Sequence, residues 1–431
     1  MESPDAPTAR HTVSRRGLLS LAAGAAAAGG AIAIGVERTI TGSDARPGGE
    51  NQPEIHPFHG EHQAGITTPV QDRLHFAAFD VADISRAELA SLLQDWTTAA
   101  AQMSQGRSAG EYPPDAGPYE APPEDTGEAM DLPPGALTIT FGFGPTLFDK
   151  DGTDRFALAA RRPRALEELP AFPGDMLHSA ISGGDLCIQA CADDPQVAVH
   201  AVRNLSRIAF GRAALRWSQL GFGRTSSTST AQVTARNLLG FKDGTANIKA
   251  EDAAGVRDHV WVPPGGDQEW MTGGTYLVTR KIRMTIETWD RTRLSEQERV
   301  IGRTKGTGAP LSGGTEFSTP DFEATGHPNQ PLIPAAAHIK LAHPANNSGH
   351  KMLRRGYNFV DGNDDIGRLN AGLFFICFQQ HPGTFIQVQS SLAKEDLLNE
   401  YIRHIGSALF AVPPGTREGQ FIGEALFTQD G

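Results

Sequence analysis

The chain has 431 residues and a formal net charge of −12, with 38 Lys and Arg against 50 Asp and Glu. This length predicts two domains or one large one. The acidic balance disfavours sequence-independent binding to nucleic acid or to an anionic membrane. Hydrophobic residues at 39% and charged residues at 20% exclude a largely disordered chain. The composition therefore indicates a soluble, acidic protein that is an enzyme or a ligand carrier.

The first predicted element is an export signal. Arg15 and Arg16 precede a long uncharged run that is mostly Ala and Gly. A paired arginine before a mildly apolar run is typical of a twin-arginine signal. An uncleaved membrane anchor is the alternative, because the run is long enough to span a bilayer. We expect a signal peptide over 1–45, export by the twin-arginine machinery, and a periplasmic, cell-envelope or extracellular location.

Residues 46–70 are predicted to form an N-terminal lead-in. The run HPFHGEHQ within it repeats histidine at every third position. On a helix these histidines would face one metal ion, but the proline and glycine in the run disfavour a helix. The favoured interpretation is a polar lead-in without a metal.

The first predicted domain covers 71–230. It begins with a strand at 74–81 and a helix that starts at the capping box Ser85–Glu88 and ends near Met103. Residues 104–135 are rich in proline and acidic side chains, which predicts a long surface loop. Further elements are expected at the strands 136–142 and 185–191 and at a helix from Asp194 to about Arg216.

The second predicted domain covers 231–431 and repeats this outline. Its expected elements are a strand at 275–287, a helix capped at Ser295, a strand at 373–380 and a helix at 395–406. Two rounds of strand, helix and strands predict an α+β fold made of two ferredoxin-like halves.

Three segments of the second half carry candidate chemistry. Asp243 lies between glycines in GFKDGTAN, His338 lies in the apolar run AAAHIKL, and Arg354 lies in MLRRGY. Taken singly, they indicate an Asp-Gly turn, a core histidine and an exposed basic pair. Together they are the groups that a haem peroxidase needs, because imidazole can ligate iron while an acid and a guanidinium handle the peroxide proton and charge.

Several longer segments then occur in a recognisable order: GEHQAGITTP at 60–69, GDLCIQACADD at 184–194, GFKDGTAN at 240–247, IGRTKGTGAPL at 301–311, AHIKLAHP at 337–344, MLRRGYNF at 352–359, LFFICFQ at 373–379 and EDLLNEYIRHIGSALFAVPPG at 395–415. With them the chain resembles the dye-decolourising (DyP-type) haem peroxidase family, and within it the exported, deferrochelatase-like branch. The resemblance covers nearly the whole chain after the signal.

The resemblance implies two ferredoxin-like domains of the duplicated α+β barrel type, with haem b in the C-terminal half. It implies a peroxidase that uses hydrogen peroxide to oxidise dye-like or phenolic reductants in one-electron steps, the reducing substrate being unknown. Deferrochelatase-like release of haem iron in iron uptake and non-enzymatic haem carriage are the alternatives. No nucleic-acid partner is expected, and self-association into a homo-oligomer stays open.

The resemblance also assigns site residues. His338 matches the iron ligand, and Asp243 and Arg354 match the catalytic pair on the distal side, where peroxide binds. Tyr357 and Trp289 are candidate electron relays, with ordinary packing aromatics as the alternative. Gly356 stands where some members of the family carry asparagine. The expected haem-binding residues are Gly244, Thr245 and Ala246 of the motif, Arg303 for a propionate, His343 at the haem edge, Leu373 and Phe375 as a dry distal wall, and Asp396 to orient His338.

Overall fold

The computed structural model describes residues 54–326 and 328–428. The predicted signal peptide and residues 46–53 of the predicted lead-in lie outside the described residues. Among the helices that are described, none is long and apolar enough to cross a membrane.

The first half has the order β-α-β-β-α-β. Its main elements are β1 (Arg73–Val81), α1 (Arg86–Met103), β2 (Thr138–Phe143), β3 (Leu186–Ala192), α3 (Pro195–Ile208) and β4 (Ala213–Arg224), with α2 (Pro145–Phe148) and two short 3-10 turns (Ala159–Arg161 and Ser179–Ile181) between them. The side chain of Ser85 accepts from the backbone N–H of Glu88, and Glu88 accepts from the backbone N–H of Ser85, so the predicted capping box starts α1.

The second half repeats this order with more irregular connections. Its strands are β5 (Thr275–Met284), β6 (Leu353–Arg354), β7 (Tyr357–Asn363), β8 (Leu369–Gln379) and β9 (Ile402–Val412). Its helices are α4 (Ala253–His259), α5 (Ile286–Asp290), α6 (Leu294–Ile301), α7 (His338–Ala342), α8 (Gly383–Glu395) and α9 (Glu424–Phe427), with 3-10 turns at Glu269–Met271, Pro344–Asn346 and Leu397–Glu400.

The strands join into one closed antiparallel ring. Each half has the same internal order, β4-β1-β3-β2 in the first and β9-β5-β8-β7 in the second. The halves meet at two seams, where β2 pairs with β9 and β4 pairs with β7. This repeat confirms the predicted duplicated ferredoxin-like α+β fold, and closure leaves few free strand edges.

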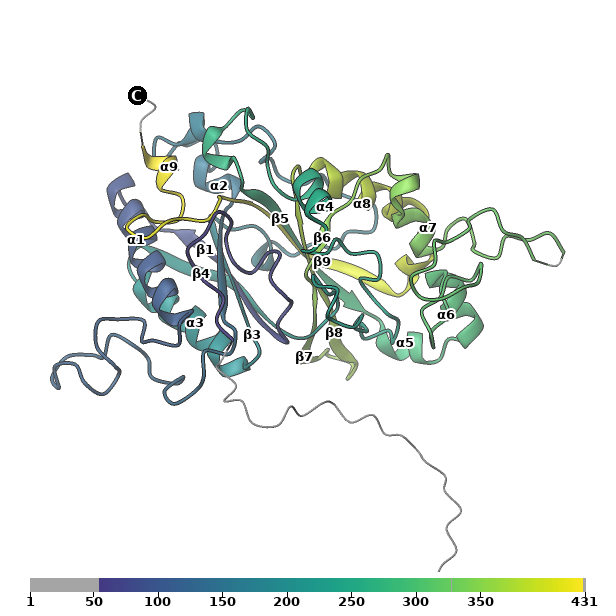
Figure 1. Ribbon diagram of the computed structural model, residues 1–431, viewed down its shortest axis with the longest axis horizontal. Helices are drawn as coiled ribbons and strands as arrows, with labels where there is room; N and C mark the ends of the chain where they lie inside the picture. Colours follow the sequence, from purple (N-terminus) through teal and green to yellow (C-terminus); the bar gives the residue numbers. More distant parts are fainter. Residues whose placement is uncertain (1–53, 327, 429–431) are drawn as a thin grey trace, which may run out of the picture. The chain divides into compact units, whose positions relative to one another are not determined.

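Alternation along the strands divides the core into an inner and an outer part. Phe76, Trp217, Phe374 and Phe410 pack inside the ring. The side chains between them face outward; those next to Phe410 on β9 are buried, whereas those next to Trp217 on β4 are exposed. In Figure 1, α1 and α3 cover the first half, and α5 to α8 lie on the side of the second half.

Four predicted boundaries were wrong. The strand predicted over 275–287 ends at Met284 as β5, and its last two residues begin α5. The helix predicted to reach Arg216 ends at Ile208, because Gly211 takes a φ of +80° and the chain turns into β4. Ser295 lies inside α6 and does not cap it, since the N-cap is Arg293. The segment 395–406 is a 3-10 turn followed by β9, and the helix precedes it as α8.

The predicted acidic loop at 104–135 contains no helix or strand. It docks on α3 through Asn204, which donates to Thr126 Oγ1 at 2.8 Å and accepts from the Thr126 backbone N–H at 3.2 Å. The ring of His200 lies 3.4 Å from both Asp125 and Glu128 of the loop. The loop is therefore anchored although it has no apolar core of its own.

The described part of the lead-in is also anchored. His62 stacks on Trp261 with ring centroids 3.8 Å apart and bonds through Nδ1 to the carbonyl of Gly273 at 2.7 Å. Among the described residues, no group of three or more His, Cys, Asp and Glu side chains is arranged to hold a metal ion. His56 lies 3.7 Å from Glu54, and the ring of His59 meets that of Phe58 edge-on.

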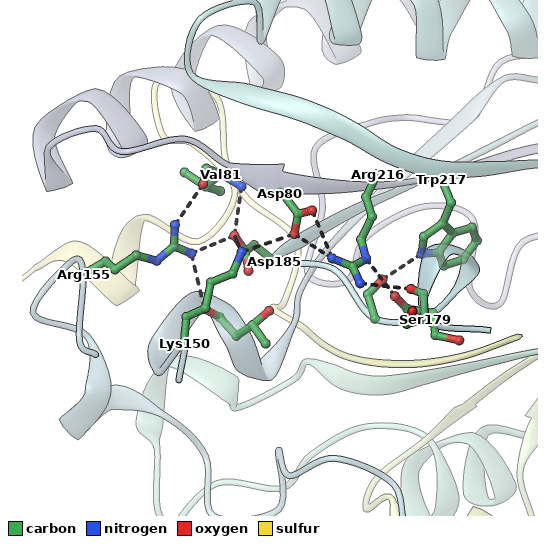
Figure 2. Close-up of polar contacts among 11 residues, drawn as sticks. Asp80, Val81, Lys150, Arg155, Ser179, Asp185, Arg216 and Trp217 are labelled. Atoms are coloured by element: carbon green, nitrogen blue, oxygen red, sulfur yellow. Dashed lines mark hydrogen bonds and ion pairs between the residues drawn. The ribbon is translucent and has the colours of Figure 1, made fainter. Parts of the chain in front are cut away.

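A network of charged residues closes the first half at one end of β1 and β3 (Figure 2). Asp185 is fully buried and accepts from the Val81 backbone N–H at 2.9 Å and from Arg155 at 2.7 Å. Lys150 joins Asp185 to Asp80, at 3.6 Å and 3.4 Å. The buried carboxylate of Asp185 is therefore paired with two basic side chains, Arg155 and Lys150.

Candidate active site

A cavity of about 260 Å³ lies in the second half, between the outer face of β5 and β8 and the helices α7 and α8. All eleven predicted site residues line it: Asp243, Gly244, Thr245, Ala246, Arg303, His338, His343, Arg354, Leu373, Phe375 and Asp396. They come from segments up to about 150 residues apart in the chain, and the closed ring brings them together.

His338 is the first residue of α7, and its ring is held by a carboxylate. Nδ1 lies 2.6 Å from Oδ2 of Asp396, a residue that is buried between α8 and the following turn. Burial by itself would lower the pKa of His338, but the charge and hydrogen bond of Asp396 raise it above its ordinary value. Nε2 makes no hydrogen bond to any residue that the structure describes, so it remains available as a ligand to a metal.

Asp243 and Arg354 form a pair at the cavity wall. Nη1 of Arg354 donates to Oδ1 of Asp243 at 3.2 Å, and Nδ2 of Asn237 donates to Oδ2 at 3.1 Å. The side chains of Asp243 and Arg354 keep 19% and 28% exposure, so both are partly accessible. An accessible carboxylate beside a fixed positive charge can exchange a proton with a small molecule in the cavity.

The two adjacent arginines have different environments. Arg354 lines the cavity, whereas Arg355 is fully buried and donates to the carbonyl of Thr68 and to Gln71. Successive residues of a strand point to opposite faces. Arg354 and Arg355 therefore do not form the exposed basic pair that the segment MLRRGY indicates when taken singly.

Gly244 lets the motif loop pass close to neighbouring backbone. Its φ is +81°, and a Cβ there would lie 2.9 Å from Cα of Ser226. Thr245 donates to Glu316 at 3.3 Å, and Glu316 also pairs with Lys242. The motif is thus held on both sides while its residues 244–246 face the cavity.

One part of the cavity lining is rich in basic side chains. Arg303 donates to the carbonyls of Gly308 and Glu316 at 2.7 Å and 2.8 Å, which fixes its guanidinium. The pKa of His343 is lowered mainly by burial, and also by the positive charges of Arg303 and Lys351. These groups favour an anionic substituent on whatever occupies the cavity.

Sequence reasoning missed polar residues of this cavity. Arg280 is 1% exposed, lines the cavity beside Phe375 and pairs with Asp175 of the first half. His404 also lines the cavity, and burial lowers its pKa to about 3. The alternation of β5 and β9 could have placed both residues on the cavity face, had β9 been predicted as a strand.

The structure places the two candidate relay residues in the interior. Tyr357 is fully buried inside the ring, and Trp289 is 1% exposed and donates to the carbonyl of Leu239 at 2.9 Å. Gly356 is also tightly enclosed, since a Cβ there would lie 2.8 Å from Oγ1 of Thr225. An asparagine at this position would displace Thr225.

Comparison with known proteins identifies relatives over most of the chain. The model for the N-terminal part of Dyp-type peroxidases matches residues 63–223, and that for the C-terminal part matches 234–417. A deferrochelatase of Escherichia coli O6:K15:H31 is 38% identical over 382 residues, which are 86% of this chain and 87% of that protein. A dye-decolorizing peroxidase of Thermobifida fusca is 40% identical over 380 residues, 84% and 83% of the two chains.

Solved structures show the same fold. Ferric DtpA from Streptomyces lividans superposes with a TM-score of 0.79 at 42% identity, covering 87% of this chain and 97% of that chain. A DyP-type peroxidase from Streptomyces coelicolor gives 0.79 at 41% identity, covering 88% and 98%. DypB from Rhodococcus jostii, described in complex with heme, gives 0.58 at 20% identity, covering 81% and 95%, and so supports the fold alone.

The residues of the cavity fit haem, and ferric DtpA, a relative at 42% identity, supports haem as the cofactor. An imidazole with a free Nε2 and an orienting carboxylate suits an axial ligand of iron. Apolar walls suit the porphyrin, and the basic lining around Arg303 suits its propionates. Together with the matches over both halves, these features show that the chain belongs to the DyP-type peroxidase family, and that it is a haem peroxidase.

Proposed function

We propose that the protein binds haem b and uses hydrogen peroxide to oxidise dye-like or phenolic reductants in one-electron steps. One observation carries this proposal: a single cavity contains the carboxylate-bound His338 and the accessible pair Asp243 and Arg354. When bound, the haem iron supplies the redox centre at which peroxide is reduced.

Four residues of the cavity have separate roles in this proposal. His338 would hold the iron through Nε2, and Asp396 keeps the His338 ring oriented by accepting from Nδ1. Asp243, while ionised, accepts a proton from peroxide at a carboxylate oxygen and returns it to the leaving oxygen. Arg354 keeps its charge throughout, so it stabilises negative charge and does not act as the base.

The apolar walls complete the arrangement. Leu373 and Phe375 of β8 line the cavity and carry no group that competes for the proton. They add apolar surface to the cavity that also contains Asp243 and Arg354.

The test uses the purified full-length protein loaded with haem. Mixing with hydrogen peroxide should change the Soret band within the mixing time, and an anthraquinone or phenolic dye should then be oxidised catalytically. A haem carrier would bind haem without turnover. Binding of haem with no reaction toward peroxide would refute the peroxidase proposal.

Release of iron from haem is the second candidate function. It is favoured by the 38% identity to a protein named deferrochelatase over 86% of this chain. Incubation with haem and a reductant should then yield metal-free protoporphyrin, which fluoresces and is separable by chromatography. Its absence, with dye oxidation intact, would leave peroxidase activity as the function.

We also propose export through the twin-arginine pathway, from Arg15 and Arg16 and the apolar run that follows them. Replacing both arginines by lysine should retain the protein in the cytoplasm, as measured by fractionation of the host. Unchanged export of this variant would contradict the proposal.

A further inference from the structure

The strand that carries Arg354 is bonded to the sheet along only one edge. β6 pairs with β8, where the backbone N–H of Arg355 donates to the carbonyl of Ile376 at 2.9 Å. In an extended strand, the backbone groups of successive residues point to opposite edges. The N–H and carbonyl of Arg354 therefore point away from β8 and need other partners.

The side chain of Asn247 supplies both partners. Its Oδ1 accepts from the backbone N–H of Arg354 at 2.7 Å, and its Nδ2 donates to the carbonyl of Arg354 at 2.8 Å. Nδ2 also donates to the carbonyl of Ser227 at 3.0 Å. The residue is 7% exposed, so few water molecules can replace these bonds. One amide thus takes the place of a neighbouring strand.

Asn247 belongs to the loop that carries Asp243. The backbone N–H of Asn247 donates to the carbonyl of Gly244 at 3.0 Å, which closes a tight turn that begins directly after Asp243. The backbone N–H of Asp243 donates to the carbonyl of Ala235 at 2.9 Å, which anchors the other end of the loop. The position of the Arg354 backbone is thereby tied to the segment that positions the Asp243 carboxylate.

We propose that Asn247 is a positioning residue that sets the spacing between Asp243 and Arg354; this rests on the proposed role of that pair in the reaction with peroxide. The side chains of the pair meet through one hydrogen bond of 3.2 Å, and their positions in the chain are 111 residues apart. Asn247 provides the direct link between their two backbones. A displacement of about 1 Å in such a pair lowers a rate roughly 100-fold.

The variant Asn247→Ala tests this, with Asn204→Ala as its matched control. Asn204 is also fully buried and also bonds through both ends of its amide, but it anchors the acidic loop on α3. Both variants lose buried hydrogen bonds and should unfold at lower temperature. Only Asn247→Ala should slow the reaction of the haem-loaded protein with peroxide, by roughly 10- to 100-fold, with its Soret absorbance ratio retained.

A double-mutant cycle separates positioning from general damage. In an Arg354→Leu background, Asn247→Ala should have little further effect on the peroxide rate, because the residue acts through Arg354. A crystal structure of haem-free Asn247→Ala should show the contact between Nη1 of Arg354 and Oδ1 of Asp243 lengthened or lost. Should Asn247→Ala fail to fold, Asn247→Ser replaces it in both measurements.

The wild-type protein distinguishes the two levels of failure. If wild type does not react with peroxide, the proposed function fails. If wild type reacts and Asn247→Ala reacts equally fast, or if its loss of rate is undiminished in the Arg354→Leu background, the positioning role is overturned. An unchanged contact between Asp243 and Arg354 in the variant's structure would overturn it as well.

Discussion

The two halves share one strand order but use their outer faces differently. In the first half, α3 packs directly on β1 and β3, and Trp96 of α1 stacks on Phe141 and donates to the carbonyl of Leu205. In the second half, the space between α8 and the faces of β5 and β8 is a cavity. The same fold thus yields a solid core where one aromatic side chain fills the layer, and a binding site where the layer is left open.

The charged residues of the two halves differ in the same way. Asp185 is fully enclosed by Arg155 and a backbone N–H, whereas Asp243 meets Arg354 at the edge of the cavity. A fully buried carboxylate cannot contact a molecule in the cavity, while an accessible pair can act on a bound molecule. Accessibility, and not the presence of an acid and an arginine, therefore distinguishes the candidate active site.

The largest expected effect is the loss of cofactor from the open half. His338→Ala should lose most of its haem, because Nε2 is the ligand offered to the iron. The measurement is the ratio of Soret to protein absorbance. His343→Ala is the control, since it lines the same cavity but uses Nδ1 to accept from the backbone N–H of Ala345. Full haem content in His338→Ala would refute the assignment.

The next effect separates the two charged pairs. Asp243→Ala and Arg354→Ala should keep haem but slow the reaction with peroxide roughly 100- to 10,000-fold, since proton transfer loses its base or its charge stabilisation. Stopped-flow absorbance measures this rate. If both variants react at the wild-type rate, the pair has no catalytic role.

The enclosed pair should give the opposite result. Asp185→Asn should reduce the free energy of unfolding by about 3 kcal/mol, because Arg155 is left without its buried partner. Urea unfolding measures the loss, and the peroxide rate of the folded variant should stay unchanged. Asp80→Asn, whose side chain is 35% exposed, should cost less than about 1 kcal/mol. A slowed peroxide reaction in Asp185→Asn would remove the distinction between the halves.

The last prediction concerns the change in the free energy of unfolding with pH, to which His75 contributes. Burial lowers the pKa of His75 in the first half to about 4, and its Nδ1 has no partner among the described residues, whereas Asp396 raises the pKa of His338. Between pH 6.5 and 4 the unfolded chain binds a proton that folded His75 does not. The free energy of unfolding is therefore unaffected by His75 above pH 6.5 and falls toward pH 4, by about 3 kcal/mol.

Urea unfolding of His75→Gln as a function of pH checks this prediction. Glutamine does not titrate, so the variant should lose less stability than wild type between pH 6.5 and 4. Parallel pH profiles for the two proteins would contradict it.

The sequence predicted the site better than the outline of the elements around it. Each of the segments around His338, Asp243 and Arg354 indicates only a structural role when taken singly. The three residues were selected because together they are the groups that a haem peroxidase needs and because their segments resemble the family. Segment 395–406 was misread because Ile402 and Ile405 are spaced as on a helix, although they lie on β9. This segment forms a strand because it pairs with β5, and no local sequence pattern reveals that pairing.

Of the supporting residues, Asp396 was predicted, whereas Asn247 and Arg280 were missed. Asn247 bonds to a residue 107 positions away, and Arg280 pairs with Asp175, 105 positions away. Their roles arise from closure of the ring and not from their neighbours in sequence. Local reasoning therefore identified residues that line the cavity, but missed contacts that form between segments distant in the chain.

The contact of Arg280 with Asp175 bears on how this fold can be recombined. Phe172, from the same first-half segment as Asp175, meets Phe385 of α8 edge-on with ring centroids 6.0 Å apart. Arg280 and Phe385 both line the cavity. The first half thus supplies part of the support of the second half's pocket, although the two family models divide the chain between residues 223 and 234. A chimera joined at that boundary inherits a complete pocket only if its donor half brings an acid and an aromatic that match these two positions.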